Sequence, residues 1–159
     1  MKRAAFCLAA ALLAPLAGAA DTAIKSFGPD SFAQIAAGAR GKPQVVMVWS
    51  LDCSYCEPSF EALKQAQRRG AKVVTIATDP ADDAEATALI GRKLAKSGLQ
   101  AETWAFGPAP ADQLRHAIDP KWRGEMPRSY WFDGSGQVRA YSGVITAERV
   151  AAMLPDRAK

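Results

Sequence analysis

The sequence predicts an α/β domain in which a central mixed sheet is flanked by helices. Two nearly continuous apolar stretches, residues 44–49 and 72–77, have the composition of strands buried on both faces. Between them, residues 59–69 carry apolar side chains at helical spacing, so the three segments form a right-handed parallel unit. A later aromatic stretch over residues 128–133 is followed by a Gly-rich turn, which indicates an antiparallel hairpin.

The other elements are expected between and beyond these segments. Helices are expected at residues 30–35, 83–97, 111–118 and 146–154, and strands at residues 101–106 and 137–142. In the helix over residues 83–97, the side chains expected to face inward are Ala86, Leu89, Ile90 and Leu94, and those expected to face outward are Arg92, Lys93 and Lys96. The Thr78-Asp79-Pro80 segment is expected to be a loop.

The chain of 159 residues has the length of one domain preceded by a secretory signal. Residues 1–20 have a basic start, an apolar stretch and the small-residue sequence Ala17-Gly18-Ala19, which together predict a cleaved signal peptide. Residues 21–41 are interpreted as an N-terminal lead-in, and residues 42–159 as the folded domain. Cys7 lies within the signal and would be lost on cleavage, so the mature chain keeps two cysteines.

The charge of the chain does not indicate a nucleic-acid partner. Cleavage of the signal removes Lys2 and Arg3, which leaves 18 basic against 16 acidic residues and lowers the formal net charge from +4 to +2. The basic residues are scattered along the chain, as on an ordinary solvated surface. We also expect no stable membrane insertion after cleavage.

The two remaining cysteines, Cys53 and Cys56, follow the strand that ends at Trp49 and precede the first long helix. Cysteines three residues apart share one side of a helical turn, so they can form a tight disulfide. The start of a helix favours a thiolate, because free N–H groups and the helix dipole stabilise negative charge there. We therefore expect Cys53 to be the nucleophile and Cys56 the thiol that resolves a mixed disulfide.

This arrangement resembles the thioredoxin superfamily, and in particular its secreted bacterial TlpA-like thiol:disulfide oxidoreductases. The resemblance rests on the Trp49–Cys56 stretch and on Met126-Pro127 followed by a strand, a hairpin and a strand. It implies a thioredoxin-like fold with a helix-strand insertion before the proline. It also implies that Pro127 is cis, that the backbone of Met126 faces Cys53 and pairs with an extended substrate segment in a groove, and that no cofactor is needed.

Other interpretations of the same residues stay open. Trp49 is either a wall of the substrate groove or a core side chain. The Cys-x-x-Cys motif is alternatively half of a zinc site, although no second half follows, or a purely structural disulfide. His116 is interpreted as a surface or core-edge residue, and Met47 as a core side chain.

The sequence also departs from the family pattern. Asp52 stands where an aromatic residue is common before the first cysteine, and its charge opposes a nearby thiolate. Met47 occupies the place of a buried aspartate. Glu57 or Glu61 would assist proton transfer instead, unless both are exposed helix charges. Arg128 either offsets Asp52 or faces solvent from its strand.

These observations predict a periplasmic thiol:disulfide oxidoreductase that acts on cysteines of other proteins. The expected direction is reductase or isomerase rather than strong oxidant, because Asp52 makes the thiolate less stable. As a reductase, the protein would need a membrane electron donor. Two alternatives are a thiol peroxidase and a copper-delivery module that binds the metal through Cys53, Cys56 and a third ligand.

Overall fold

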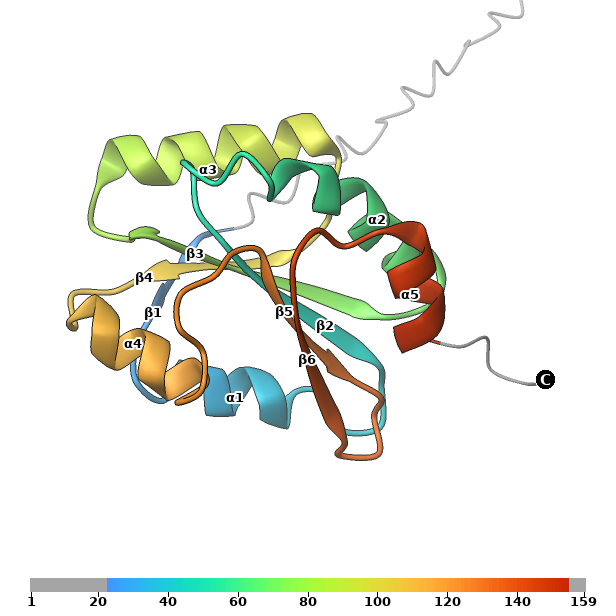
Figure 1. Cartoon of the computed structure of the whole chain (residues 1–159). Coiled ribbons are helices and arrows are strands. Elements are labelled where there is room, and N and C mark those ends of the chain that lie inside the picture. The colour runs from blue at the N-terminus through green and yellow to red at the C-terminus, as the bar shows by residue number, and fades with distance from the viewer. Residues whose placement is uncertain (1–22, 155–159) are drawn as a thin grey trace, which may run out of the picture.

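Six strands form one mixed sheet in the computed structural model, which describes residues 23–154 (Figure 1). The strands are β1 (Lys25–Phe27), β2 (Gln44–Trp49), β3 (Lys72–Pro80), β4 (Glu102–Phe106), β5 (Arg128–Phe132) and β6 (Val138–Ser142). Their order across the sheet is β1-β4-β3-β2-β5-β6. The first four are parallel to one another, whereas β5 runs antiparallel to β2 and β6 antiparallel to β5.

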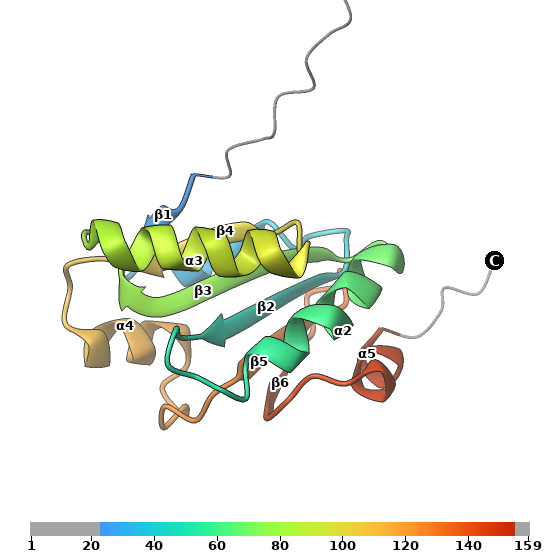
Figure 2. The same ribbon diagram turned by 90° about the horizontal axis from the view of Figure 1, so that it is seen from above.

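Five helices cover the two faces of this sheet (Figures 1 and 2). They are α1 (Ser31–Ala37), α2 (Glu57–Arg68), α3 (Ala84–Ser97), α4 (Ala111–Ile118) and α5 (Ala147–Met153). Apolar side chains of α2, α3 and α5 share one buried cluster, and those of α1 and α4 share another on the opposite face. The expected mixed sheet flanked by helices is therefore confirmed, including the inserted α3 and β4.

Strand β2 lies at the centre because its side chains are apolar on both faces. Val45, Met47 and Trp49 join the cluster under α2, whereas Val46 and Val48 join the opposite one. Successive side chains of a strand point to opposite faces, so a continuous apolar run suits a strand covered on both sides. Each such side chain contributes about 1.5–3 kcal/mol on full burial. The bounds of β2 agree with the expectation from sequence.

The ends of α2 and α3 follow from capping residues. Gly70, at φ 84°, lets the chain turn after α2, and the N–H groups of Gly70 and Ala71 donate to the carbonyls of Gln67 and Ala66. The carboxylate of Asp83 accepts from two backbone N–H groups in the first turn of α3. The expected inward orientation of Leu89 is wrong, since its side chain is 39% exposed.

Two strands differ from the expectation. β3 continues through Pro80, where a loop was expected, because residue 80 still pairs with β4 after an irregularity. β1 was not expected at all, and it adds an edge strand to the sheet from within residues 21–41. At this edge, the carboxylate of Glu102 forms ion pairs with the ammonium groups of Lys25, at 2.9 Å, and Lys72, at 2.6 Å. Burial alone would raise the pKa of Glu102, but these two ammonium groups lower it to about 2.

The predicted signal peptide, residues 1–20, lies outside the described residues. Among residues 23–154, no helix has both the length and the apolar character needed to cross a bilayer.

Candidate active site

The two cysteines form a disulfide at the end of β2 nearest the start of α2. The bond joins Cys53 to Cys56, and their Cα atoms are 5.4 Å apart. Two tight turns bring the sulfurs together: the Cys53 N–H donates to the Ser50 carbonyl at 3.2 Å, and the Cys56 N–H donates to the Cys53 carbonyl at 3.1 Å. Cys56 is the N-cap of α2, so the helix begins at the next residue. The strand thus delivers the cysteines to a helix N-terminus.

The two sulfur-bearing residues differ in exposure. Cys56 is 1% exposed and belongs to the core cluster beneath α2, whereas Cys53 is only partly buried. The residues around Cys53 are open to solvent, with Tyr55 71% exposed and Asp52 and Ser54 also exposed. Cys53 is therefore the cysteine of this pair that an incoming molecule can reach.

Met126, which precedes Pro127, packs against the core cluster that contains Cys56. The Met126-Pro127 peptide bond is cis, which confirms the expectation from sequence. Met126 and Cys53 are both partly buried and both pack against the core cluster that contains Cys56. The Pro127 carbonyl accepts from the Gly143 N–H at 2.9 Å, so the segment before β5 is joined to the end of β6. The segment before β5 and the cysteine turn thus pack against the same core cluster.

Trp49 lies in the same core cluster as Cys56. Its side chain is fully buried, and its ring packs edge-on against Phe60 of α2 with centroids 5.1 Å apart. Among the described residues, its indole N–H has no hydrogen-bond partner. Of the two interpretations made from sequence, core packing describes this side chain, and the groove-wall interpretation does not. Met47 is fully buried as expected.

Arg128 has neither of the roles considered for it. Its guanidinium is 14% exposed and donates to Asp119 at 2.8 Å and to the Ser142 hydroxyl at 2.8 Å. Glu125 lies 3.6 Å from the same guanidinium and accepts from Ser142. Burial raises the pKa of the neighbouring Tyr130 to about 12. The arginine is thus engaged by the loop that leads to Met126 and is not a counter-charge for Asp52.

The remaining polar candidates lie at the surface. Glu61 pairs with Lys64 within α2, and Glu57 is 56% exposed at the start of that helix. His116 is exposed on α4 and lines a surface depression of about 460 Å³ together with Arg115 and Arg123. Within residues 23–154, no three side chains among His, Cys, Asp and Glu converge as metal ligands would.

Two residues at the cysteine turn were not identified from sequence. The Leu51 N–H donates to the Asp79 carboxylate at 3.0 Å, and the Lys93 ammonium donates to the Leu51 carbonyl at 3.3 Å. The sequence pattern predicts a loop at Asp79 and an outward orientation for Lys93. The order of the strands in sequence could have identified Asp79, because parallel strands β2 and β3 end at the same edge of the sheet. A polar residue at the end of β3 therefore lies near the residues that follow β2.

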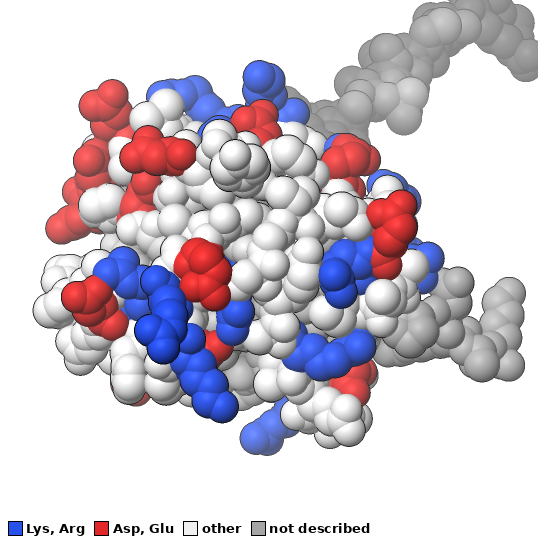
Figure 3. Space-filling model, in the orientation of Figure 1, with Lys and Arg blue, Asp and Glu red and all other residues white. Residues whose placement is uncertain are grey.

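The charged side chains divide the surface seen in Figure 3. Acidic groups gather over the N-terminal end of α3 (Figure 3), where Asp82 and Asp83 precede the helix and Glu85 lies in its first turn, all three exposed. Basic groups gather over α4 and the loop that follows it (Figure 3). Uncharged surface lies between the two patches.

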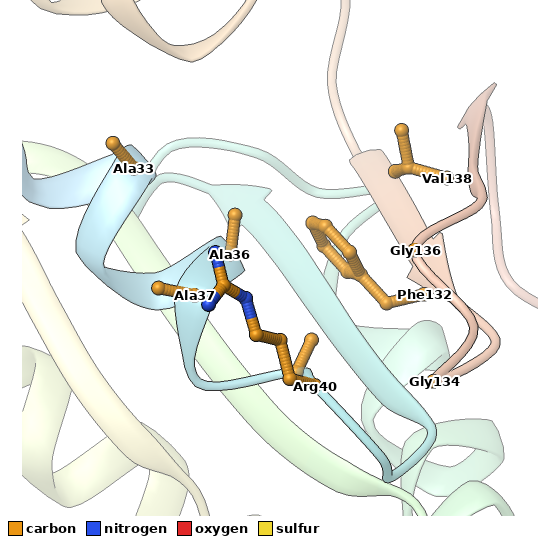
Figure 4. Close-up of a pocket in the computed structure, with 9 residues that line it drawn as sticks. Ala33, Ala36, Ala37, Arg40, Phe132, Gly134, Gly136 and Val138 are labelled. Carbon is orange, nitrogen blue, oxygen red and sulfur yellow. The ribbon is translucent and has the colours of Figure 1, made fainter.

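A further pocket, of about 500 Å³, lies between α1 and the β5–β6 hairpin. It is lined largely by alanine and glycine, and Arg40, Phe132 and Val138 border it (Figure 4). It does not include the cysteine turn.

No protein-family model matches this sequence, and no curated protein matches it. Among solved structures, a secreted Mycobacterium tuberculosis disulfide oxidoreductase homologous to E. coli DsbE is similar, with 19% identity over 73% of this chain and 85% of that chain and a TM-score of 0.54. StoA from Bacillus subtilis has 13% identity over 72% and 83% of the two chains, with a TM-score of 0.51. A DsbF homologue from Corynebacterium diphtheriae has 18% identity over 74% and 73%, with a TM-score of 0.54. The chain therefore has the thioredoxin-like fold.

Proposed function

We propose that this protein is a thiol:disulfide oxidoreductase that exchanges disulfides with cysteines of other proteins. The observation that carries the proposal is the Cys53–Cys56 disulfide at the start of α2, with one partly exposed sulfur-bearing residue and one buried. The similarity in fold to a secreted disulfide oxidoreductase supports it.

The reaction needs only these two sulfurs. In the reduced protein, the Cys53 thiolate attacks one sulfur of a partner disulfide, and the partner's other sulfur leaves and takes up a proton. Cys56 then loses its proton and attacks the Cys53 sulfur, which releases the partner's remaining thiol and forms the Cys53–Cys56 bond. Two electrons and two protons pass to the partner in total. The same steps in reverse oxidise a partner dithiol.

Charges around the cysteine turn favour the reductase or isomerase direction. Asp52 directly precedes Cys53 and is exposed. The Asp79 carboxylate accepts a hydrogen bond from the N–H of Leu51, which lies two residues before Cys53. Arg128 is engaged by Asp119 and Glu125, so Lys93, whose ammonium donates to the Leu51 carbonyl, is the cation at the turn that opposes these two carboxylates. Negative charge near a thiolate makes it less stable, and a strong oxidant needs a very stable thiolate. A reductase in an oxidising compartment would draw electrons from a membrane donor.

Activity is tested with the mature protein and a disulfide-containing protein substrate. Reduced protein should become oxidised as substrate thiols appear in equal number, and Cys53→Ser should abolish this. The potential of the pair, measured against glutathione, should be well below about −120 mV, the value typical of the strongest oxidants of this kind. Absence of thiol transfer would contradict the activity, and a potential near that value would contradict the direction.

We place the protein in the periplasm, on the strength of the predicted signal peptide. Protein recovered from that compartment should begin at Ala20 or Asp21, as measured by intact mass. A mass that retains Met1, or a lipid on Cys7, would contradict this location and processing.

A further inference from the structure

Leu51, two residues before Cys53, forms hydrogen bonds with ionisable side chains through both its backbone N–H and its carbonyl. The Leu51 N–H donates to Asp79 Oδ2 at 3.0 Å, and Lys93 Nζ donates to the Leu51 carbonyl at 3.3 Å. Asp79 comes from the end of β3 and Lys93 from the inserted helix α3. Hydrogen bonds that involve a charged group are stronger than neutral ones. The turn that carries Cys53 is thus fixed by two elements outside the Cys-x-x-Cys segment.

Lys93 also reaches the other side of the motif. Its ammonium lies 3.9 Å from the carboxylate of Glu57, the residue directly after Cys56. The side chain of Lys93 is only 28% exposed, which reduces screening of its charge by solvent. One cation therefore lies against the backbone before Cys53 and against the side chain after Cys56.

Asp79 is joined to the same set of charges. It is partly buried, and burial raises its pKa, while the Leu51 N–H lowers it; the negative charge of Asp52 adds to the rise and Lys93 opposes it. These interactions link Asp52, Glu57, Asp79 and Lys93 around the turn, and the exposed Tyr55 is the further ionisable side chain between the two cysteines.

We propose that Asp79 and Lys93 are positioning residues that fix the Cys53 turn and set, through their opposite charges, the acidity of Cys53 and the reduction potential of the pair. This inference rests on the proposed thiol:disulfide exchange. A cation near Cys53 favours its thiolate, which stabilises the reduced protein; a carboxylate has the reverse effect. When the disulfide opens, the two bonds to Leu51 keep the turn in place.

The signs of the expected changes follow directly. Lys93→Met removes the cation, so the pKa of Cys53 should rise by about half a unit to one unit. The potential should fall by up to about 30 mV, which corresponds to a tenfold change in the equilibrium constant. Asp79→Asn keeps an oxygen that accepts from Leu51 but loses the charge, so both quantities should move in the opposite direction by a similar amount. Asp79→Ala loses the bond as well and should also slow thiol exchange.

The test is to titrate the Cys53 thiolate by ultraviolet absorbance and to equilibrate each variant with glutathione. Lys96→Met is the matched control, because Lys96 is exposed on the same helix and its removal should change neither quantity. Lys93→Arg keeps the charge and should restore values close to wild type. Thermal unfolding confirms that each variant is folded.

Opposite shifts for Lys93→Met and Asp79→Asn, with Lys96→Met unchanged, would support the proposal. The proposal would be overturned if Lys93→Met and Asp79→Asn shifted the pKa of Cys53 and the reduction potential in the same direction. Shifts no larger than those of Lys96→Met would overturn it as well. If wild-type protein does not exchange with glutathione at all, the proposed function fails. Exchange by wild type without charge-dependent shifts would refute only the roles of Asp79 and Lys93.

Discussion

Replacing Cys56 with Ser should leave partner proteins covalently attached to Cys53. The variant keeps the partly exposed cysteine that we propose as the nucleophile, but it lacks the buried thiol, 1% exposed in the oxidised protein, that would release the product. The second thiol acts at very high effective concentration because the turn holds it beside the first. Turnover should therefore fall by on the order of a hundredfold or more, since release then depends on thiols from solution. Non-reducing gels of cells that carry the variant should show new bands of high mass that disappear on reduction.

The matched controls are Cys53→Ser and the variant with both serines. Neither has the attacking sulfur, so neither should trap partners. Equal trapping by Cys53→Ser would show that Cys56 also attacks partner disulfides and that the exposure of the two residues does not decide their roles. Mass spectrometry of the reducible bands would identify the partner proteins.

The central strands and the cysteine turn could be predicted from sequence because their causes are local. Residues 44–49 are apolar at every position but the first, and only a strand covered on both faces accommodates such a run. The Cys-x-x-Cys spacing and the helix-ending Gly70 likewise act over a few residues. Family resemblance supplied the cis geometry of Pro127, which no local pattern predicts.

What could not be predicted depends on pairing between distant segments. β1 has three residues, too short for any periodicity, and it is defined by its pairing with β4. Lys93 follows the spacing of an outward helix position, yet α3 packs where its ammonium reaches Leu51. Arg128 alternates as an outer strand residue would, but the loop before it folds back and covers it. For β1 and for Lys93, the sequence separation between partners exceeds the range of a helical or strand pattern, and for Arg128 the same holds for its partner Asp119.

The second large effect is expected at Arg128, where replacement by Met should destabilise the fold. The guanidinium and its partner Asp119 are 14% and 19% exposed, so the pair is largely removed from solvent. Removing one member of a buried pair leaves an uncompensated charge, and partial exposure here limits the loss to about 2–3 kcal/mol. For a domain of this size that is a fall in melting temperature of about 10 °C. Arg92→Met, which removes an exposed arginine from α3, is the control and should change the melting temperature little.

At acid pH, the free energies of unfolding of wild type and Arg128→Met should differ less than they do at pH 7. Burial alone would raise the pKa of Asp119, but the Lys121 N–H, the Arg128 guanidinium and the Tyr130 hydroxyl together lower it below its ordinary value. A carboxyl with a lowered folded-state pKa contributes stability that is present above its unfolded value, about 4, and lost as the pH falls through the folded value. Denaturant unfolding at pH 7 and below pH 4 measures this. A difference that stays constant with pH would show that Arg128 acts through packing of its side chain and not through the ion pair.

The same variant should also lower the rate of thiol exchange. Arg128 pairs with Asp119 and Glu125, the two ends of the loop that leads to Met126, and the Ser142 hydroxyl donates to Glu125. Met126 and Cys53 pack against the same core cluster. Without these bonds, the Met126 segment should be less ordered where a partner chain would contact it, so KM for a protein substrate should rise more than kcat falls. The potential of the Cys53–Cys56 pair should be unchanged, because Arg128 is not among the charges that contact the cysteine turn. A shift in potential as large as that expected for Lys93→Met would show that the charge of Arg128 reaches the thiolate after all.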